Sequence, residues 1–249
     1  MTNKAIVIVG GNLLAKELLK SFELNGCSVF LNDFSKAKQI DVVIETTNVD
    51  LEQKKLNLQE IESVVSPNTI ILSTTLQVTA TEAASWLRYP ERLIGFATFS
   101  NFSEGKVIEV AAALQSDTGL LSNVKETFGA INQEVEVVED EVGLVYPRIL
   151  SLIINEAAFA LTEGTANAKD IDTAMKQGTN YPLGPLEWAE RIGIDDVYAV
   201  LIGLHKQFGE ERYRPAPLIK KLVQAGWTGG ESEKGFHHYQ NRRVKEFSI

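Results

Sequence analysis

The chain has 249 residues, 44% of them hydrophobic and 23% charged, which is an ordinary globular composition and excludes disordered and collagen-like chains. A single cysteine excludes an internal disulfide framework, three histidines make a metal site unexpected, and a net charge of −9 argues against nucleic acid as a partner. The sequence has no apolar run of about 18 residues and no signal-peptide pattern, so we expect a cytoplasmic protein that does not cross a membrane.

Strand and helix patterns alternate over residues 1–142. Strands are predicted at residues 4–9, 27–32, 41–45, 69–73, 92–99, 106–113 and 134–138. Helices are predicted after Asn12 and at residues 50–64, 79–87 and 118–130. This alternation indicates an α/β domain with a doubly wound, largely parallel sheet.

The pattern changes after residue 142, where strand signals end. Helical segments are predicted at residues 147–164, 168–177, 185–190, 194–208 and 215–225. We therefore divide the chain into an α/β domain at 1–142 and an all-helical C-terminal domain at 143–249.

The first predicted strand is followed by a glycine turn, a helix and a second strand that ends in an acid. This order of elements is the layout of dinucleotide-binding domains. Gly10 supplies the tight turn, and Ala15 is a permitted third position of the fingerprint. Asn12 stands at the second position, where glycine normally lets the backbone approach the pyrophosphate; asparagine tolerates left-handed backbone angles, but its side chain takes up space. Asp33 stands 18 residues after Ala15, a suitable distance for a ribose hydroxyl. The layout thus predicts dinucleotide contacts at Gly10, Asn12, Ala15 and Asp33, and a Rossmann-like scaffold with a decayed nucleotide site is the alternative.

The connection from the second strand to the third is short. Only seven residues, 34–40, separate Asp33 from the strand at 41–45. A link of this length spans at most about 25 Å, and crossing over the first strand takes roughly 20 Å, so the link holds no helix and no further strand. We predict a truncated Rossmann-like sheet in which the strand at 27–32 is an edge, with weakened binding of an adenine-containing cofactor.

Long sequence motifs occur in both halves of the chain. The second half contains INEAAFALTEGTANAKDIDTAMKQGTNYPLGPLEWAERIGIDD, ERYRPAPLIKKLVQAGWTG and KGFHHY, and the first half contains VIVGG, DVVIE and PERLIGFATF with KVIEV. These motifs resemble the 3-hydroxyacyl-CoA dehydrogenase family. The resemblance covers nearly the whole chain. It implies a Rossmann-like NAD-binding domain joined to a helical domain that pairs two subunits, and hydride transfer between NAD and the C3 carbinol of an acyl-CoA.

The family's acid–base histidine is missing from this chain. Its motif I-G-M-H-F-F-N-P matches residues 94–101, which places Ala97 where the family has histidine. The resemblance implies that Glu109 is the glutamate that would orient this histidine, so Glu109 is the catalytic candidate. A methyl group cannot exchange protons. Glu109 is then a remnant, or pairs with another group, or serves as a rewired base if burial raises its pKa.

Other family features are altered as well. Pro147 stands at the asparagine of G-F-x-x-N-R and offers no side-chain hydrogen bond, although proline suits the first turn of a helix. The family's S-N-T-S segment matches residues 72–75, with Ser73 as a candidate for its serine, and Val49 replaces an expected acid. The segment missing after the second strand is where the family builds its coenzyme A clasp. Lys54 matches a lysine near the cofactor, with an exposed helix lysine as the alternative.

Three functions stay open. We favour a dimeric binding or regulatory module in which normal dehydrogenase activity is impaired or absent. The alternatives are an active NAD-dependent 3-hydroxyacyl-CoA dehydrogenase with a rewired site that uses Glu109, and a related oxidoreductase on a smaller substrate. We expect weak or lost NAD binding, an acyl-CoA-like molecule as the possible small-molecule partner, and a homodimer formed through the helices at 147–164 and 194–208.

Overall fold

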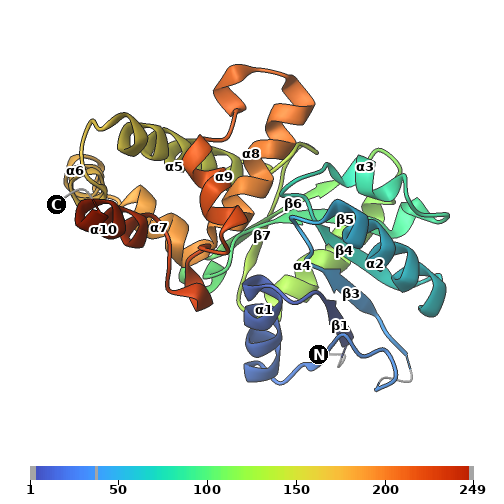
Figure 1. Cartoon of the computed structure of the whole chain (residues 1–249). Coiled ribbons are helices and arrows are strands. Elements are labelled where there is room, and N and C mark those ends of the chain that lie inside the picture. Colours follow the sequence, from blue (N-terminus) through green and yellow to red (C-terminus); the bar gives the residue numbers. More distant parts are fainter. Residues whose placement is uncertain (1–3, 37–38, 247–249) are drawn as a thin grey trace. The chain divides into compact units, whose positions relative to one another are not determined.

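The chain divides into two compact units, with the division after Pro147. The structure, a computed structural model, describes residues 4–36 and 39–246. Figure 1 shows the first unit as strands flanked by helices and the second unit as helices. The division falls in the first turn of helix α5 (Tyr146–Glu163), whereas the sequence pattern places the domain boundary after residue 142.

The first unit contains a seven-stranded sheet in the order β2-β1-β3-β4-β5-β6-β7. Strands β1 to β5 are parallel, β6 is antiparallel to β5, and β7 is parallel to β6. The strands are β1 (Ala5–Val9), β2 (Ser28–Leu31), β3 (Val42–Glu45), β4 (Ile70–Thr74), β5 (Leu93–Ala97), β6 (Val107–Ala112) and β7 (Glu134–Val137). The predicted fold class is confirmed.

Strand β2 lies at one edge of the sheet, as predicted from the short connection that follows it. Ile6 of β1 lies opposite Val29 of β2 on one side and opposite Val42 of β3 on the other. The connection therefore crosses β1 directly. Residues 34–36 and 39–40 of this connection form no helix or strand, and residues 37–38 lie outside the described part of the chain.

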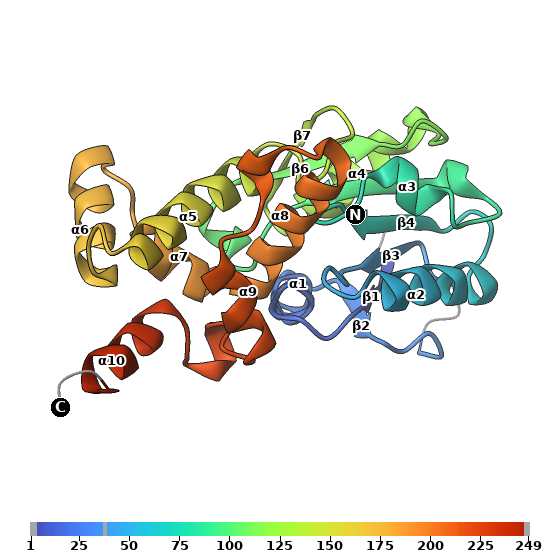
Figure 2. The ribbon, with the colours of Figure 1, turned by 45° about the horizontal axis from the view of Figure 1, so that its top comes forward.

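Helices cover both faces of this sheet (Figure 2). They are α1 (Leu13–Leu24), α2 (Leu51–Val64), α3 (Ala80–Ala84) and α4 (Leu121–Gly129). Because side chains alternate along a strand, Ile6 and Ile8 of β1 pack in the core formed with α1 and α4, and Val7 and Val9 pack in the core formed with α2 and α3. The continuous β-branched run of β1 thus serves two cores, as expected for a central parallel strand.

The second unit is built from helices. After α5 they are α6 (Ala168–Thr179), α7 (Pro185–Ile192), α8 (Ile194–Phe208), α9 (Pro217–Gln224) and α10 (Phe236–Glu246). The sequence pattern predicted these helices except α10, whose sequence is largely polar. Two features stabilise the first half of α10. Phe236 is fully buried, and the Gln240 side chain accepts a hydrogen bond from the backbone N–H of Ala168 at 2.7 Å. Among the described helices, none combines the length and the apolar character that crossing a membrane requires.

A buried carboxylate joins three helices of this unit. Asp172 of α6 accepts hydrogen bonds from the backbone N–H groups of Leu186 and Glu187 at 2.8 and 3.0 Å, which caps α7. Its Oδ2 also lies 2.8 Å from Nε2 of His237 on α10, and the backbone N–H of His237 donates to Glu190 of α7. The hydrogen bond with Asp172 raises the pKa of His237; burial opposes this shift, and the charges of Glu190, Asp172 and Glu187 add to it.

Replacement of His237 by glutamine should remove a pH-dependent part of the stability. Because the pKa of His237 is raised above its unfolded value of about 6.5, its stabilising contribution is complete below about pH 6.5 and is lost as the pH rises through the raised folded value. We expect this contribution to be at most about 1 kcal/mol, because the side chain is 36% exposed and solvent screens the pair. Urea unfolding from about pH 5.5 to about pH 8.5 measures it.

The matched control is His238→Gln. The His238 ring packs edge-on against Trp227, with ring centroids 4.8 Å apart, rather than against a carboxylate. The unfolding free energy of this control should keep the wild-type pH dependence. The assignment is wrong if His237→Gln keeps that dependence too.

Candidate functional site

The residues predicted to contact NAD lie at the carboxyl ends of the parallel strands β1, β2 and β3. Gly10 follows β1, Asp33 follows β2, and the Lys54 ammonium lies against the end of β3. The chain leaves β1 toward β2 on one side, while β3 lies on the other side of β1. In open α/β sheets, ligands bind at such a change of direction, outside the carboxyl ends of the strands.

Gly10 occupies a position that only glycine can fill. Its φ is +143°, and a Cβ atom there would lie 2.1 Å from Oγ1 of Thr46. The Asn32 side chain closes the other side of the turn, because it accepts from the N–H of Gly10 at 3.0 Å and donates to its carbonyl at 2.9 Å. Sequence reasoning missed Asn32, which adopts a left-handed φ of 51° directly before Asp33.

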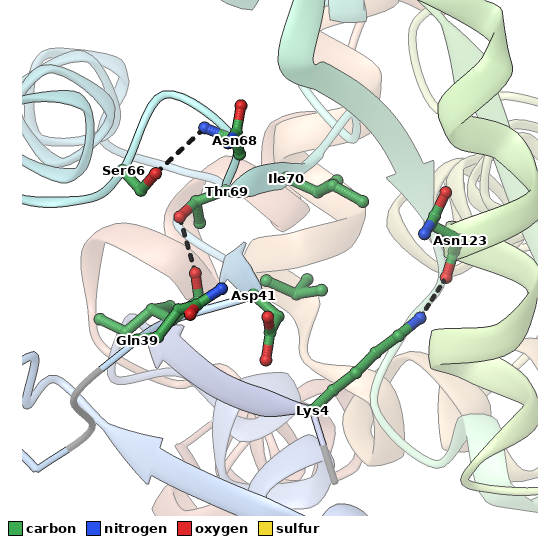
Figure 3. Close-up of a pocket in the computed structure, with 10 residues that line it drawn as sticks. Lys4, Gln39, Asp41, Ser66, Asn68, Thr69, Ile70 and Asn123 are labelled. Carbon is green, nitrogen blue, oxygen red and sulfur yellow. Dashed lines mark hydrogen bonds between the residues drawn. The ribbon is translucent and has the colours of Figure 1, made fainter. Parts of the chain in front are cut away.

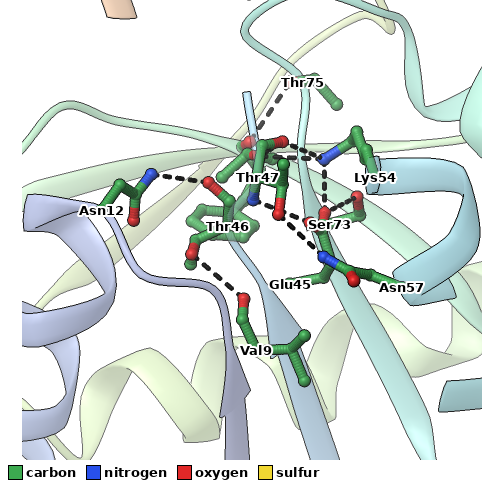
Figure 4. Close-up of polar contacts among 11 residues, drawn as sticks. Val9, Asn12, Glu45, Thr46, Thr47, Lys54, Asn57, Ser73 and Thr75 are labelled. Carbon is green, nitrogen blue, oxygen red and sulfur yellow. Dashed lines mark hydrogen bonds and ion pairs between the residues drawn. The ribbon is translucent and has the colours of Figure 1, made fainter. Parts of the chain in front are cut away.

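Asn12 caps helix α1. Its φ of −78° and ψ of 176° are extended, so the residue does not use the left-handed tolerance considered from the sequence. Its Oδ1 accepts a hydrogen bond from the N–H of Ala15 at 3.0 Å, and its Nδ2 donates to the carbonyl of Thr46 at 2.7 Å (Figure 4). Ala15 is fully buried beside Gly10, as the third position of the fingerprint requires.

The Asp33 carboxylate is engaged with its own loop. Its Oδ1 accepts from the N–H of Ser35 at 3.0 Å and from the Ser35 hydroxyl at 2.7 Å, and Oδ2 lies 3.3 Å from Nζ of Lys36. The hydrogen bonds from Ser35, followed by the interaction with Lys36, lower the pKa of Asp33. A ribose hydroxyl would therefore share this carboxylate with partners that are already present.

Lys54 is buried, with 1% of its surface exposed, so the alternative of an exposed helix lysine is wrong. Its Nζ donates to Oε2 of Glu45 at 2.5 Å, to the carbonyl of Thr47 at 3.0 Å and to Oγ1 of Thr74 at 3.0 Å (Figure 4). An ammonium group has three N–H donors, so all three are in use. Burial lowers the pKa of Lys54, and the charge of Glu45 opposes that shift.

Glu45 is the centre of this buried network, although sequence reasoning gave it no role. Its Oε1 accepts from the N–H of Thr47 at 2.7 Å, and its Oε2 accepts from the Ser73 hydroxyl at 3.0 Å as well as from Lys54. Ser73, the candidate for the family's serine, thus points at Glu45 in the fully buried interior. An acid that closes a strand of buried residues was the available signal, because such a charge needs a partner.

Glu109 lies beside Ala97, the position that the resemblance assigns to the family's histidine. In the antiparallel register of β5 and β6, Ala97 is directly opposite Glu109. The Glu109 carboxylate accepts from the backbone N–H groups of Val145 at 2.8 Å and Tyr146 at 2.9 Å, at the start of α5. Burial raises the pKa of Glu109, and these two hydrogen bonds oppose the shift. Pro147 comes next in the first turn of α5, the helical role considered for it from the sequence.

A separate polar pocket of about 170 Å³ lies at the opposite, amino-terminal ends of the strands (Figure 3). Its side chains have partners within the chain: Lys4 pairs with Glu126, Asp41 accepts from the N–H of Ala5, and Thr69 donates to the carbonyl of Ile40. The described residues contain no cluster of three or more His, Cys, Asp or Glu side chains suited to a metal ion.

Comparison with known proteins identifies the family. The description of the 3-hydroxyacyl-CoA dehydrogenase NAD binding domain matches residues 15–141, and that of the C-terminal domain of these enzymes matches residues 143–239. The chain belongs to the 3-hydroxyacyl-CoA dehydrogenase family. The resemblance found in the sequence is therefore confirmed. The NAD-domain match begins at Ala15, so the glycine turn from Gly10 to Asn12 lies outside it.

Individual relatives agree with this assignment. The 3-hydroxybutyryl-CoA dehydrogenase of Bradyrhizobium diazoefficiens is 34% identical over 203 residues, which cover 82% of this chain and 69% of the relative. The probable 3-hydroxybutyryl-CoA dehydrogenase of Bacillus subtilis is 33% identical over 207 residues, which cover 83% of this chain and 72% of the relative. A crystal structure of (S)-3-hydroxybutyryl-CoA dehydrogenase from Ralstonia eutropha gives a TM-score of 0.77 at 26% identity, over 95% of this chain and 99% of that one.

The Lys54–Glu45 pair should be essential to stability. Lys54→Met leaves the Glu45 charge buried without its cation, and loss of one partner of a buried pair costs about 3–5 kcal/mol. The double variant Glu45→Gln/Lys54→Met removes both charges and should recover at least about half of that loss. Urea unfolding measures both. The control is Lys55→Met, because Lys55 is the exposed neighbour on α2; a Lys54→Met loss no larger than that of the control would contradict the prediction.

Proposed function

We propose that this chain is a 3-hydroxyacyl-CoA dehydrogenase family member whose normal dehydrogenase activity is impaired or absent, and that it acts as a dimeric binding or regulatory module. One observation carries the proposal. Ala97 faces Glu109 across β5 and β6, and the carboxylate that would orient a histidine is instead held by the start of α5. The pair that would move the hydroxyl proton thus has a methyl group in place of its imidazole.

The chemistry supports this proposal. Residues 1–147 contain no histidine, the residue type that titrates near neutral pH. Thr98 and Ser100 follow Ala97 in the chain, and the N–H of Tyr146 donates to Glu109. Their side chains carry hydroxyl groups, which are poor bases at neutral pH. Loss of a general base typically lowers a rate by about a hundredfold to ten-thousandfold. Pro147, at the family's asparagine position, adds a second loss at the substrate oxygen.

A rewired dehydrogenase that uses Glu109 as its base is the second candidate function. It is favoured by the burial of Glu109, which raises the pKa of this carboxyl toward the range of a useful base. This function is disfavoured by the hydrogen bonds that the Glu109 carboxylate accepts from two backbone N–H groups. These bonds stabilise the charged form of Glu109 and fix its side chain. A related oxidoreductase on a smaller substrate would need the same proton acceptor.

The ligands and the assembly are part of the proposal. Family membership supports two ligands for this chain. They are NAD, with weak or lost binding, and an acyl-CoA-like molecule. A homodimer through the helical domain is supported by Ile149 of α5, which is 54% exposed. The second helix expected at this interface, α8, has most of its apolar residues buried, so we assign the dimer contact mainly to α5.

Purified protein should turn over acetoacetyl-CoA and NADH poorly. We expect about 0.1 per second or less, since ordinary enzymes have a median near 10 per second and the missing base alone removes at least about a hundredfold. NADH absorbance at saturating substrate measures the rate, and the Bradyrhizobium diazoefficiens relative, assayed in parallel, is the positive control. Turnover within about tenfold of the ordinary median would refute the proposal.

Glu109→Gln separates the two candidate functions. If Glu109 caps α5, the variant should lose roughly 1 kcal/mol of stability, because a negative charge at a helix N-terminus is removed, while any residual turnover stays within about threefold. If Glu109 is a rewired base, residual turnover should fall by about a hundredfold or more. Residual turnover and urea unfolding, measured on the same preparation, decide between them.

A further inference from the structure

The turn after β1 and the segment after β3 meet across the change of strand direction. Thr46 is fully buried, its N–H donates to the carbonyl of Val9 at 2.9 Å, and its hydroxyl lies 3.1 Å from the same oxygen. Thr46 therefore sits over the end of β1, and Oγ1 occupies the space beside Gly10 where a Cβ atom would stand. The two segments that would flank a dinucleotide are in direct contact.

The Asn12 side chain stabilises this contact between the turn after β1 and the segment after β3. One end of its amide accepts the N–H of Ala15, in the first turn of α1, and the other end donates to the carbonyl of Thr46 at 2.7 Å. Both hydrogen-bonding ends of a short, two-torsion side chain are thus fixed. Figure 4 shows the Asn12 amide directed at Thr46 between the ends of the two strands.

A dinucleotide would need the same space and one of the same donors. Its pyrophosphate binds the N–H groups at the start of the helix after the first strand, and glycine at the second fingerprint position lets the backbone approach it. Here that position carries a side chain, and the chain itself already uses the N–H of Ala15. The residues present, in the arrangement described, do not fit a pyrophosphate.

We propose that the Asn12–Thr46 bridge closes the phosphate-binding turn, so that Asn12 is the residue that sets the low affinity of this chain for NAD. This inference rests on the proposed function, because it gives a physical cause for weakened cofactor binding. It is independent of the missing histidine, which concerns the proton and not the nucleotide. Removal of the Asn12 side chain should reopen the turn to ligands that carry a diphosphate.

Three variants of the full chain test the bridge. Asn12→Gly removes both contacts and restores the usual fingerprint residue; Asn12→Ser keeps an acceptor for Ala15 but loses the donor to Thr46; Asn12→Asp also keeps the acceptor and adds a charge that repels phosphate. Calorimetric titration with NADH should show binding at least about tenfold tighter for Asn12→Gly than for the wild type, a smaller gain for Asn12→Ser and none for Asn12→Asp.

Two controls separate the bridge from other effects. Asn25→Gly makes the same change at the exposed C-terminal cap of α1 and should leave NADH affinity unchanged. Adenosine lacks phosphate, so its affinity should be the same in the wild type and in Asn12→Gly, whereas ADP-ribose should follow NADH.

The inference is overturned if NADH binds folded Asn12→Gly and Asn25→Gly within twofold of each other, or if the wild type already binds NADH at low micromolar concentration. If Asn12→Gly fails to fold, Asn12→Ser decides, and its failure to bind more tightly than the wild type overturns the inference. These results concern affinity alone. Turnover of acetoacetyl-CoA by the wild type would instead overturn the proposed function.

Discussion

One buried ion pair, between Glu45 at the end of β3 and Lys54 on α2, orders the candidate site. Removing two charges from water is costly, and such a pair is tolerated only when further hydrogen bonds satisfy its remaining atoms. The hydroxyls of β4 and the backbone of Thr47 supply them. Because Thr47 directly follows Thr46, the pair also holds the segment whose carbonyl accepts a hydrogen bond from Asn12.

Both units use a carboxylate to hold the start of a helix. In the helical unit, Asp172 caps α7 and holds α10, and Asn155 joins α5 to the segment before α9 through the backbone of Arg214 and Ala216. These are structural tasks for polar groups. In the first unit, Glu109 stands opposite the place of the family's histidine, yet it too bonds to a helix start. Glu109, the carboxylate that the resemblance assigns to catalysis, thus has the hydrogen-bond partners of a helix cap.

The parts of this structure that the sequence predicted are those that chain length and periodicity constrain. The seven-residue connection after Asp33 allowed only one placement of β2, at the edge. Asn32 was missed because its partner Gly10 stands 22 residues away, and no local pattern marks such a contact. Glu45 was open to prediction as an acid at the end of a buried strand. Lys54 was open to better prediction: it shares helical spacing with the buried Leu58, and this stripe faces the sheet.

The turn that we propose to be closed and the position assigned to the family's histidine lie far apart. Asn12 follows β1 and Ala97 ends β5, and two strands stand between β1 and β5, which corresponds to three strand spacings or about 14 Å. Changes separated by more than about 10 Å act independently, so their free energies add and their rate factors multiply. A turn that opens to the nucleotide would still lack the group that takes the hydroxyl proton, and an imidazole beside Glu109 would still lack a bound nicotinamide. Under the proposed function, the chain is therefore two separate steps from dehydrogenase chemistry, one governing affinity and one governing proton transfer.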